Sequence, residues 1–220
     1  MIRGLLLDFY GTVVEDDDSI MEAIAARVAA GASSPVSARE VMAAWFREYD
    51  AVAYGPRFRN LRECATLSLA TVMAEIGCAG DAAELHAAQS AYWPAPSLRD
   101  GTLEFLSQVS VPICVVSDAD RATLEAAIAL HRLSFAAVVT SEDVGAYKPA
   151  GSMFAAGLAA LGLSPDEVLH IGDSLSCDVA GAHAAGIRAV WVNRLGRPAP
   201  AGAPITHEVA DLRGVGALLS

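Results

Sequence analysis

The sequence predicts an α/β protein: a Rossmann-like, doubly wound parallel sheet with an inserted all-helical cap domain. Three observations predict it. From residue 111 onward, short apolar or β-branched runs alternate with alanine-rich stretches of helical period, which is the pattern of right-handed βαβ crossovers. A further apolar run stands at residues 2–9. Between the apolar run at 2–9 and the alternating region that begins at 111, the chain carries helix-capping signatures and no strand pattern.

Fully buried parallel strands form short, continuous apolar runs. By that criterion we expect strands at 2–9, 111–117, 135–141, 167–173 and 187–193. The helical stretches between the later strands are 121–133, 151–163 and 178–186. After the loop "GRPAPAGAP", the segment 205–219 predicts a last short strand and helix.

Residues 16–96 interrupt this alternation and are expected to be helical throughout. Each of three capping pairs precedes a run of helical period: Ser19 with Glu22, Ser37 with Glu40, and Asp81 with Glu84. A helical block inserted just after the first strand is typical of a lid. We therefore expect residues 1–15 plus 97–220 to form the α/β core and residues 16–96 to form the cap.

Composition narrows the class of protein. The chain has 220 residues, 54% of them hydrophobic, so it can bury a sizeable core. Its net charge of −11 argues against nucleic acid or an anionic membrane as the main partner, because both need a basic face. No apolar run approaches the roughly 18 residues of a membrane span. The four cysteines lack metal-ligand spacing and suggest reduced thiols in a cytoplasmic protein. The sequence gives no oligomeric state.

Polar residues stand where the predicted strands end. In open parallel sheets, ligands bind beyond the carboxyl ends of the strands. Asp8 ends the first strand, Ser117 ends the second, and Asp173 ends the fourth, with Asp178 five residues later. Lys148, which is the only lysine of the chain, follows the third strand. The fold should therefore bring these five side chains together.

Each residue type suits one part of a phosphoryl-transfer reaction. A carboxylate at a strand end, here Asp8, can attack phosphorus and form an aspartyl phosphate. A site that holds an anion beside its own carboxylates needs a cation, and Mg²⁺ prefers oxygen ligands. The expected ligands are Asp8, Asp173, Asp178 and the Tyr10 carbonyl.

The remaining candidates would position the substrate. Lys148 and Ser117 supply a positive charge and a hydroxyl donor, and backbone amides near Gly11 and Thr12 supply further hydrogen bonds. Asp118 and Arg47 are candidate substrate contacts, although Asp118 also suits a helix cap. The five histidines show no metal-ligand spacing and are expected to be structural or exposed.

Four motifs together resemble the haloacid dehalogenase-like (HAD) hydrolase superfamily. They are "DFYGT" (8–12), "VVSDAD" (115–120), "KPAGSMF" (148–154) and "GDSLSCDVAGAHAAG" (172–186), in the order and at the spacing of that family. Any one of them occurs by chance, but the ordered set is specific. The resemblance covers essentially the whole chain and implies a hydrolase with a Rossmann-like core and a cap.

The first motif departs from the phosphatase pattern at Tyr10. Most phosphatases of this superfamily carry an aspartate at that position, as the general acid and base. A phenol, with a pKa near about 10, is a poor base at neutral pH. The form "DxYGT" resembles the 2-haloacid dehalogenases, in which the aspartate attacks carbon and halide leaves without a proton. Those dehalogenases work without metal, however, and lack the paired acids Asp173 and Asp178.

Three functions follow from this conflict. We expect a Mg²⁺-dependent hydrolase of a small phosphate ester that acts through an aspartyl phosphate on Asp8. The first alternative is a 2-haloacid dehalogenase-type hydrolase, and the second is a weakly catalytic protein that binds a phosphorylated ligand. The phosphonate hydrolases of the superfamily need a lid lysine, which this chain lacks because Lys148 belongs to the core motif.

Overall fold

A computed structural model describes residues 1–216 and 218 of the chain. It divides into two compact units. The α/β unit contains Met1–Asp16, Pro96–Asp118 and His131–Ser220. The helical unit contains Asp17–Ala95 and Ala119–Leu130. Residues 119–130 therefore group with the helical segments, whereas the sequence placed them in the core range 97–220.

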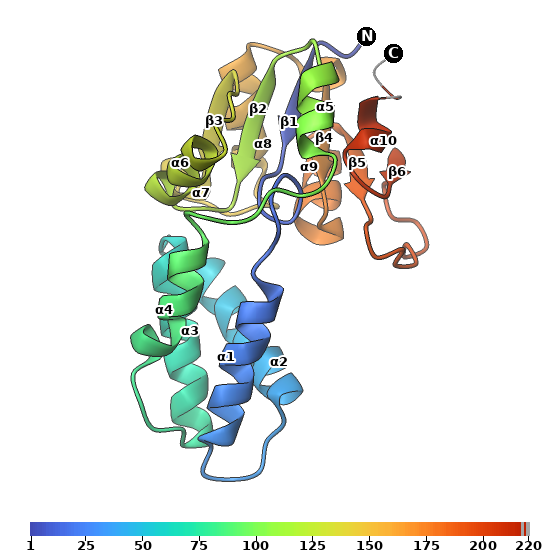
Figure 1. Ribbon diagram of the computed structural model, residues 1–220. Helices are drawn as coiled ribbons and strands as arrows, with labels where there is room; N and C mark the ends of the chain where they lie inside the picture. The colour runs from blue at the N-terminus through green and yellow to red at the C-terminus, as the bar shows by residue number, and fades with distance from the viewer. Residues whose placement is uncertain (217, 219–220) are drawn as a thin grey trace. The chain divides into compact units, whose positions relative to one another are not determined.

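The α/β unit is built on a sheet that has six strands among the described residues, in the order β3-β2-β1-β4-β5-β6 (Figure 1). Its strands are β1 (Gly4–Leu7), β2 (Ile113–Ser117), β3 (Ala137–Thr140), β4 (Val168–Gly172), β5 (Arg188–Val192) and β6 (His207–Val209). All neighbouring strands pair in parallel. The sheet confirms the predicted fold class, including the last short strand. Its central strands β1, β2 and β4 are buried throughout, which is why they form continuous apolar runs.

Helices of the α/β unit lie in front of the sheet and behind it (Figure 1). They are α5 (Thr102–Gln108), α7 (Ser141–Val144), α8 (Gly151–Leu161), α9 (Ala180–Ala184) and α10 (Arg213–Gly216), with a short 3₁₀ turn η1 (Pro165–Glu167) and a π-helical turn η2 (Leu175–Val179). Behind the sheet, Met153 and Phe154 of α8 pack with Leu6, Val116 and Trp191 in one buried cluster. The predicted last helix covers 213–216 in the structure, and Ala217 and Leu219 lie outside the described residues.

The helical unit has its own core. Its helices are α1 (Asp18–Ala30), α2 (Ala38–Ala53), α3 (Leu61–Ile76), α4 (Ala82–Tyr92) and α6 (Arg121–Leu130). Ile24 and Val28 of α1, Trp45 of α2, and Leu69 and Val72 of α3 are buried in one apolar cluster. No strand lies among residues 17–95, as the sequence analysis expected.

The helix starts agree with the sequence only in part. Ser37 and Glu40 form the predicted capping box at α2, and the Asp81 side chain caps α4. Ser19 does not cap α1: that helix begins at Asp18, with Asp17 in the cap position. The Asp17 carboxylate is buried and accepts hydrogen bonds from Gln89 Nε2 (2.7 Å) and Trp93 Nε1 (2.6 Å), and these long-range contacts place the chain at the start of α1.

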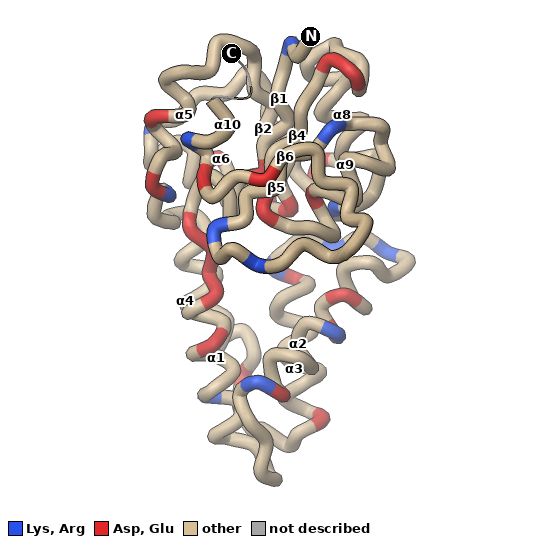
Figure 2. Tube along the Cα trace, turned by 90° about the vertical axis from the view of Figure 1, so that its right-hand side faces the viewer, with Lys and Arg blue, Asp and Glu red and all other residues tan. Residues whose placement is uncertain are grey.

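Charge is scattered over the molecule rather than gathered. In Figure 2 acidic positions outnumber basic ones and occur along much of the chain, in line with its net charge of −11. Among the residues described, there is no helix whose length and apolar character would suit a membrane span.

Candidate active site

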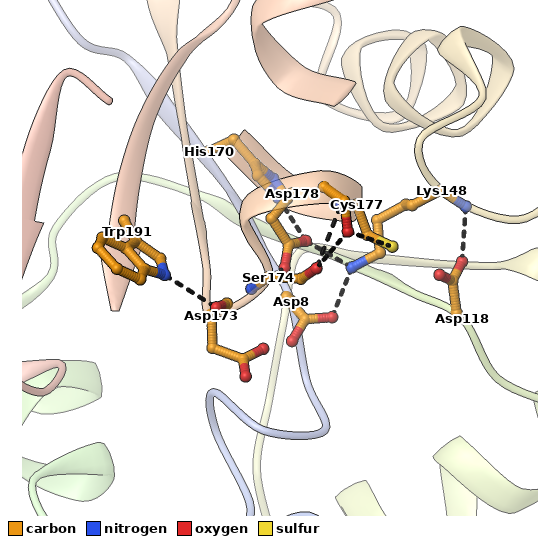
Figure 3. Close-up of polar contacts among 10 residues, drawn as sticks. Asp8, Asp118, Lys148, His170, Asp173, Ser174, Cys177, Asp178 and Trp191 are labelled. Atoms are coloured by element: carbon orange, nitrogen blue, oxygen red, sulfur yellow. Dashed lines mark hydrogen bonds and ion pairs between the residues drawn. The ribbon is translucent and has the colours of Figure 1, made fainter. Parts of the chain in front are cut away.

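The carboxyl ends of three central strands form the site. Asp8 follows the last residue of β1, Ser117 is the last residue of β2, and Asp173 follows the last residue of β4. Because β1 lies between β2 and β4, the topology places these residues at one edge of the sheet. Figure 3 shows that Asp8, Lys148, Asp173 and Asp178 converge there.

The turn after β1 is tight. The Phe9 carbonyl accepts hydrogen bonds from the backbone N–H groups of Thr12, Val13 and Val14. Gly11 stands in the left-handed region, with φ +85°. A Cβ at Gly11 would lie 2.9 Å from Asp173 Oδ1. Glycine is therefore required here both by the backbone conformation and by the close approach of the Asp173 carboxylate.

Lys148 holds two of the carboxylates. Its Nζ lies 2.6 Å from Asp8 Oδ1 and 2.6 Å from Asp178 Oδ1, and all three side chains are buried. Burial alone would lower the pKa of Lys148, but the charges of Asp178, Asp8 and Asp118 outweigh burial and hold that pKa well above its usual value. Lys148 is therefore a fixed cation. Its backbone N–H is also anchored, because it donates to Asp118 Oδ1 at 2.9 Å.

Asp178 is surrounded by donors. Its Oδ1 accepts from Lys148 Nζ and from His170 Nε2 (2.9 Å), and its Oδ2 accepts from the Ser174 N–H (3.0 Å). Burial alone would raise the pKa of Asp178, but Lys148 and His170 outweigh it and hold that pKa well below its usual value. The donors fit around Asp178 only because residue 172 is glycine, since a Cβ there would lie 2.2 Å from Asp178 Cγ.

Asp8 and Asp173 carry negative charge that the protein does not fully balance. Burial raises the pKa of Asp8, Lys148 opposes that rise, and Asp178 adds to it. Burial, followed by the charges of Asp8 and Asp178, raises the pKa of Asp173 to about 7. The Asp8 Oδ2 atom is buried, and no group of the described residues donates a hydrogen bond to it.

These carboxylates fit a divalent cation. One oxygen each from Asp8, Asp173 and Asp178 lies within 4.8 Å of the others. With all three carboxylates ionised, as metal binding requires, the positive charge of Lys148 leaves a net charge of −2 on these four groups, which a divalent cation would balance. Oxygen donors are what Mg²⁺ prefers.

The other candidate residues lie in different surroundings. Ser117 is buried at the end of β2 beside Thr140 of β3, and the Tyr10 backbone pairs with Val14 in an isolated bridge. The Gly11 and Thr12 N–H groups donate to the Val14 and Phe9 carbonyls, so these amides, predicted to bind substrate, are engaged within their own turn. The Thr12 hydroxyl is buried, and none of the described residues forms a hydrogen bond with it.

Arg47 belongs to α2 of the helical unit, where it is exposed and donates to the Ala43 carbonyl of its own helix at 3.3 Å.

Sequence reasoning missed His170. Its side chain is fully buried on β4 and packs edge-on against Phe154, with 5.1 Å between ring centroids. Its Nε2 contacts Asp178, while its Nδ1 is buried without a partner. Because Asp178 accepts from it, we assign the proton to Nε2. The sequence feature that could have indicated His170 is its position as a lone polar residue inside the apolar strand "EVLHIGD".

A family model for haloacid dehalogenase-like hydrolases matches residues 2–186. The chain belongs to this family. The match includes all four motifs and confirms the family that the motifs resembled.

The HAD chain has relatives that are named for two chemistries. A phosphoserine phosphatase from Thermus thermophilus is 41% identical over 100 residues, which cover 46% of this chain and 39% of that protein. A ribulose-1,5-bisphosphate 5-phosphatase from Halopiger xanaduensis is 36% identical over 112 residues, or 46% of each chain. (S)-2-haloacid dehalogenase 4A from Burkholderia cepacia is 29% identical over 122 residues, or 54% of this chain and 52% of that one. The alignments thus span about half or less of these relatives.

Solved structures resemble the whole chain. An L-2-haloacid dehalogenase from Xanthobacter autotrophicus is 20% identical, with a TM-score of 0.76, and 100% of this chain aligns with 98% of that one. A HAD hydrolase from Bacillus subtilis bound to magnesium is 23% identical, with a TM-score of 0.76, and 100% of this chain aligns with 99% of that one. At such identities the likeness shows the fold.

Proposed function

We propose that this HAD hydrolase is a Mg²⁺-dependent phosphatase that cleaves small phosphate monoesters through an aspartyl phosphate on Asp8. The observation that carries the proposal is the charge of the site: three carboxylates within 4.8 Å share one fixed cation. Displacement of a halide from carbon does not require this excess of negative charge. The phosphatase relatives support the same chemistry.

The geometry around Asp8 supports its role as nucleophile. Lys148 Nζ holds Oδ1, whereas Oδ2 has no hydrogen-bond partner and is the oxygen available to attack phosphorus. The hydroxyls of Ser117 and Thr12 are candidate donors to the phosphoryl oxygens. His170 and the Ser174 N–H orient Asp178, and Asp178 in turn fixes Lys148 Nζ beside Asp8.

Asp8, Asp173 and Asp178 would hold Mg²⁺, with the Tyr10 carbonyl as a further oxygen donor. When bound, the ion supplies the positive charge that lets an anionic phosphoryl group approach three carboxylates. We further propose that residues 16–96 serve as the lid of this core and that Arg47 contacts the substrate.

The test is phosphate release from p-nitrophenyl phosphate by the purified chain, with Mg²⁺ and with EDTA. We expect turnover only with the metal, and its loss in Asp8→Asn. Lys148→Met, which keeps the length of the side chain without its charge, should lower kcat strongly. Full turnover by Asp8→Asn contradicts the proposal.

Tyr10 and the haloacid dehalogenase relative favour a second candidate function, which is the hydrolytic dehalogenation of a 2-haloacid. If Mg²⁺-dependent phosphate release is absent, halide release from 2-chloropropionate tests the dehalogenase reaction. A phosphoenzyme that forms and does not turn over would instead favour a weakly catalytic protein that binds phosphorylated ligands.

A further inference from the structure

The proposed phosphatase lacks one group that its reaction needs. The leaving oxygen must receive a proton in the first step, and the attacking water must lose one in the second. Tyr10 stands where most phosphatases of the family have the aspartate that does both. Lys148 cannot replace it, because two carboxylates hold its Nζ. Asp178 cannot either, because three donors occupy its oxygens.

Asp118 follows the last residue of β2, the strand next to β1. In the parallel pairing of β1 with β2, Leu7 is opposite Val115. Asp8 directly follows Leu7, and Asp118 follows Val115 by three residues, so both carboxylates stand just past the carboxyl ends of paired strands. Asp118 directly follows Ser117, and its carboxylate is half-buried at the same sheet edge as Asp8.

One oxygen of Asp118 is anchored. Oδ1 accepts the Lys148 N–H at 2.9 Å, which fixes the carboxylate beside the segment that carries the site's cation. Figure 3 shows this contact, with the second oxygen turned away from the Lys148 nitrogen. The other oxygen takes no part in this contact and is the one that we assign to proton transfer.

We propose that Asp118 is the general acid and base of this hydrolase, in place of the aspartate that Tyr10 replaces. This inference rests on the proposed phosphatase function. In the first step, Asp8 Oδ2 bonds to phosphorus, the ester P–O bond breaks, and the Asp118 carboxyl gives its proton to the departing oxygen, which releases an alcohol. In the second step, Asp118 takes a proton from the water that attacks phosphorus, Asp8 leaves as a carboxylate, and Asp118 is again protonated.

The surroundings of Asp118 make this proton cycle feasible near neutral pH. Burial raises the pKa of Asp118 to about 7. Lys148 opposes the rise through its charge and its N–H, while Asp178 and Asp8 add to it. Cys177 also faces Asp118, as a neutral thiol whose own pKa burial raises. An exposed aspartate would have released its proton well below neutral pH and could not act as an acid.

A simpler role for Asp118 would be to anchor Lys148 and nothing more. Three substitutions separate the two roles. Asp118→Asn keeps an oxygen that can accept the Lys148 N–H but cannot exchange a proton. Asp118→Ala removes both functions, and Asp118→Glu restores the acid on a longer side chain.

The experiment compares p-nitrophenyl phosphate, whose leaving group needs no proton, with phenyl phosphate, whose leaving group needs one. For Asp118→Asn we expect kcat/KM to fall by about 10²-fold or more with phenyl phosphate and far less with p-nitrophenyl phosphate. Because the second step would lack its base, p-nitrophenol should appear in a burst followed by slow turnover. In the wild type, kcat/KM for phenyl phosphate should fall as pH rises through the pKa of Asp118, which burial raises above that of an exposed aspartate. Asp118→Asn should lose that decline, and Asp118→Glu should regain part of the activity.

Two outcomes overturn the inference and are distinguishable from each other. If the wild type turns over both esters and Asp118→Asn keeps the wild-type ratio of kcat/KM values and the wild-type pH profile, Asp118 only anchors Lys148. If the wild type hydrolyses neither ester with Mg²⁺, the proposed phosphatase function fails and the inference fails with it.

Discussion

At the scale of single residues, Gly11 sets how closely the nucleophile turn approaches Asp173. Gly11→Ala should lose about 1–2 kcal/mol of stability from its left-handed backbone alone. It should also displace the Asp173 carboxylate, because the new Cβ would lie 2.9 Å from Oδ1. We therefore expect weaker Mg²⁺ binding, measured by isothermal titration calorimetry.

Gly162→Ala is the matched control. Gly162 has φ +66°, and a Cβ there would meet nothing within 4 Å. It should lose a similar amount of stability in urea unfolding and keep wild-type Mg²⁺ affinity. If both variants bind the ion like the wild type, the close contact at Asp173 does not matter for the metal site.

Asp173 should make the metal-free protein less stable at high pH. Burial and the charges of Asp8 and Asp178 raise its pKa from 3.8 to about 7. Between these two values the folded protein holds a proton that the unfolded chain has released, so stability falls as pH rises through that window. With EDTA, Tm should therefore decline by a few degrees between about pH 5 and pH 8. Asp173→Asn should flatten the decline in part, since Asp118 has a pKa raised in the same direction; a wild-type slope in this variant would contradict the assignment.

The positions of several candidate site residues at one sheet edge were predictable, because parallel strands end at the same edge. Asp8, Ser117, Lys148 and Asp173 stand at or beyond strand ends, and their types suit an anion and a cation. His170 was not predictable in this way, because a histidine inside an apolar strand reads as a core residue until Asp178 is known to lie against it. The hydrogen bonds of the Gly11 and Thr12 N–H groups to carbonyls of their own turn also depend on the geometry of the turn, which the sequence does not specify.

At the scale of elements, strands were predicted closely and helix starts only in part. A buried parallel strand consists of consecutive apolar residues, so the sequence alone indicates it. The start of a helix also depends on what the side chain of the cap residue contacts. The N-terminus of α3 illustrates this. Asn60 forms a local capping box with Glu63, and Asp120, which is 59 residues away, accepts the Leu61 N–H at 2.6 Å. The helix α5 begins at Thr102 with Gly101 in the cap position, which has no side chain to form a cap, so no sequence signal marked this start.

Two serines in similar sequence contexts should therefore differ in their effect on stability. Ser37 accepts the Glu40 N–H at 3.2 Å, and Glu40 bonds back to the Ser37 N–H at 2.8 Å. Ser37→Ala should lower the free energy of unfolding in urea by about 1 kcal/mol. Ser19→Ala should change it by less than about 0.5 kcal/mol, because Ser19 is an exposed residue within α1 rather than its cap. Equal losses in the two variants would place the start of α1 at Ser19 after all.

At the scale of the whole molecule, each unit has a separate apolar core, and the proposed metal ligands belong to only one unit. Asp8, Asp173 and Asp178 all lie in the α/β unit. An ion that binds only the folded state stabilises the unit it binds, by about 2.7 kcal/mol at 100 times its Kd. Units with independent cores need not unfold together. Mg²⁺ should therefore stabilise the α/β unit specifically.

The three tryptophans allow this to be measured. Trp191 belongs to the α/β unit and donates to the Asp173 carbonyl at 2.9 Å, while Trp45 and Trp93 belong to the helical unit. In a Trp45→Phe, Trp93→Phe double variant, fluorescence follows the α/β unit alone. Its melting temperature should rise with MgCl₂ and stay nearly constant with NaCl of equal ionic strength, which controls for screening of the net charge of −11. In Trp191→Phe, which reports the helical unit, the shift should be much smaller. Equal shifts in both variants would mean that the two units unfold as one, and equal effects of the two salts would mean that Mg²⁺ acts by screening and not at the carboxylates.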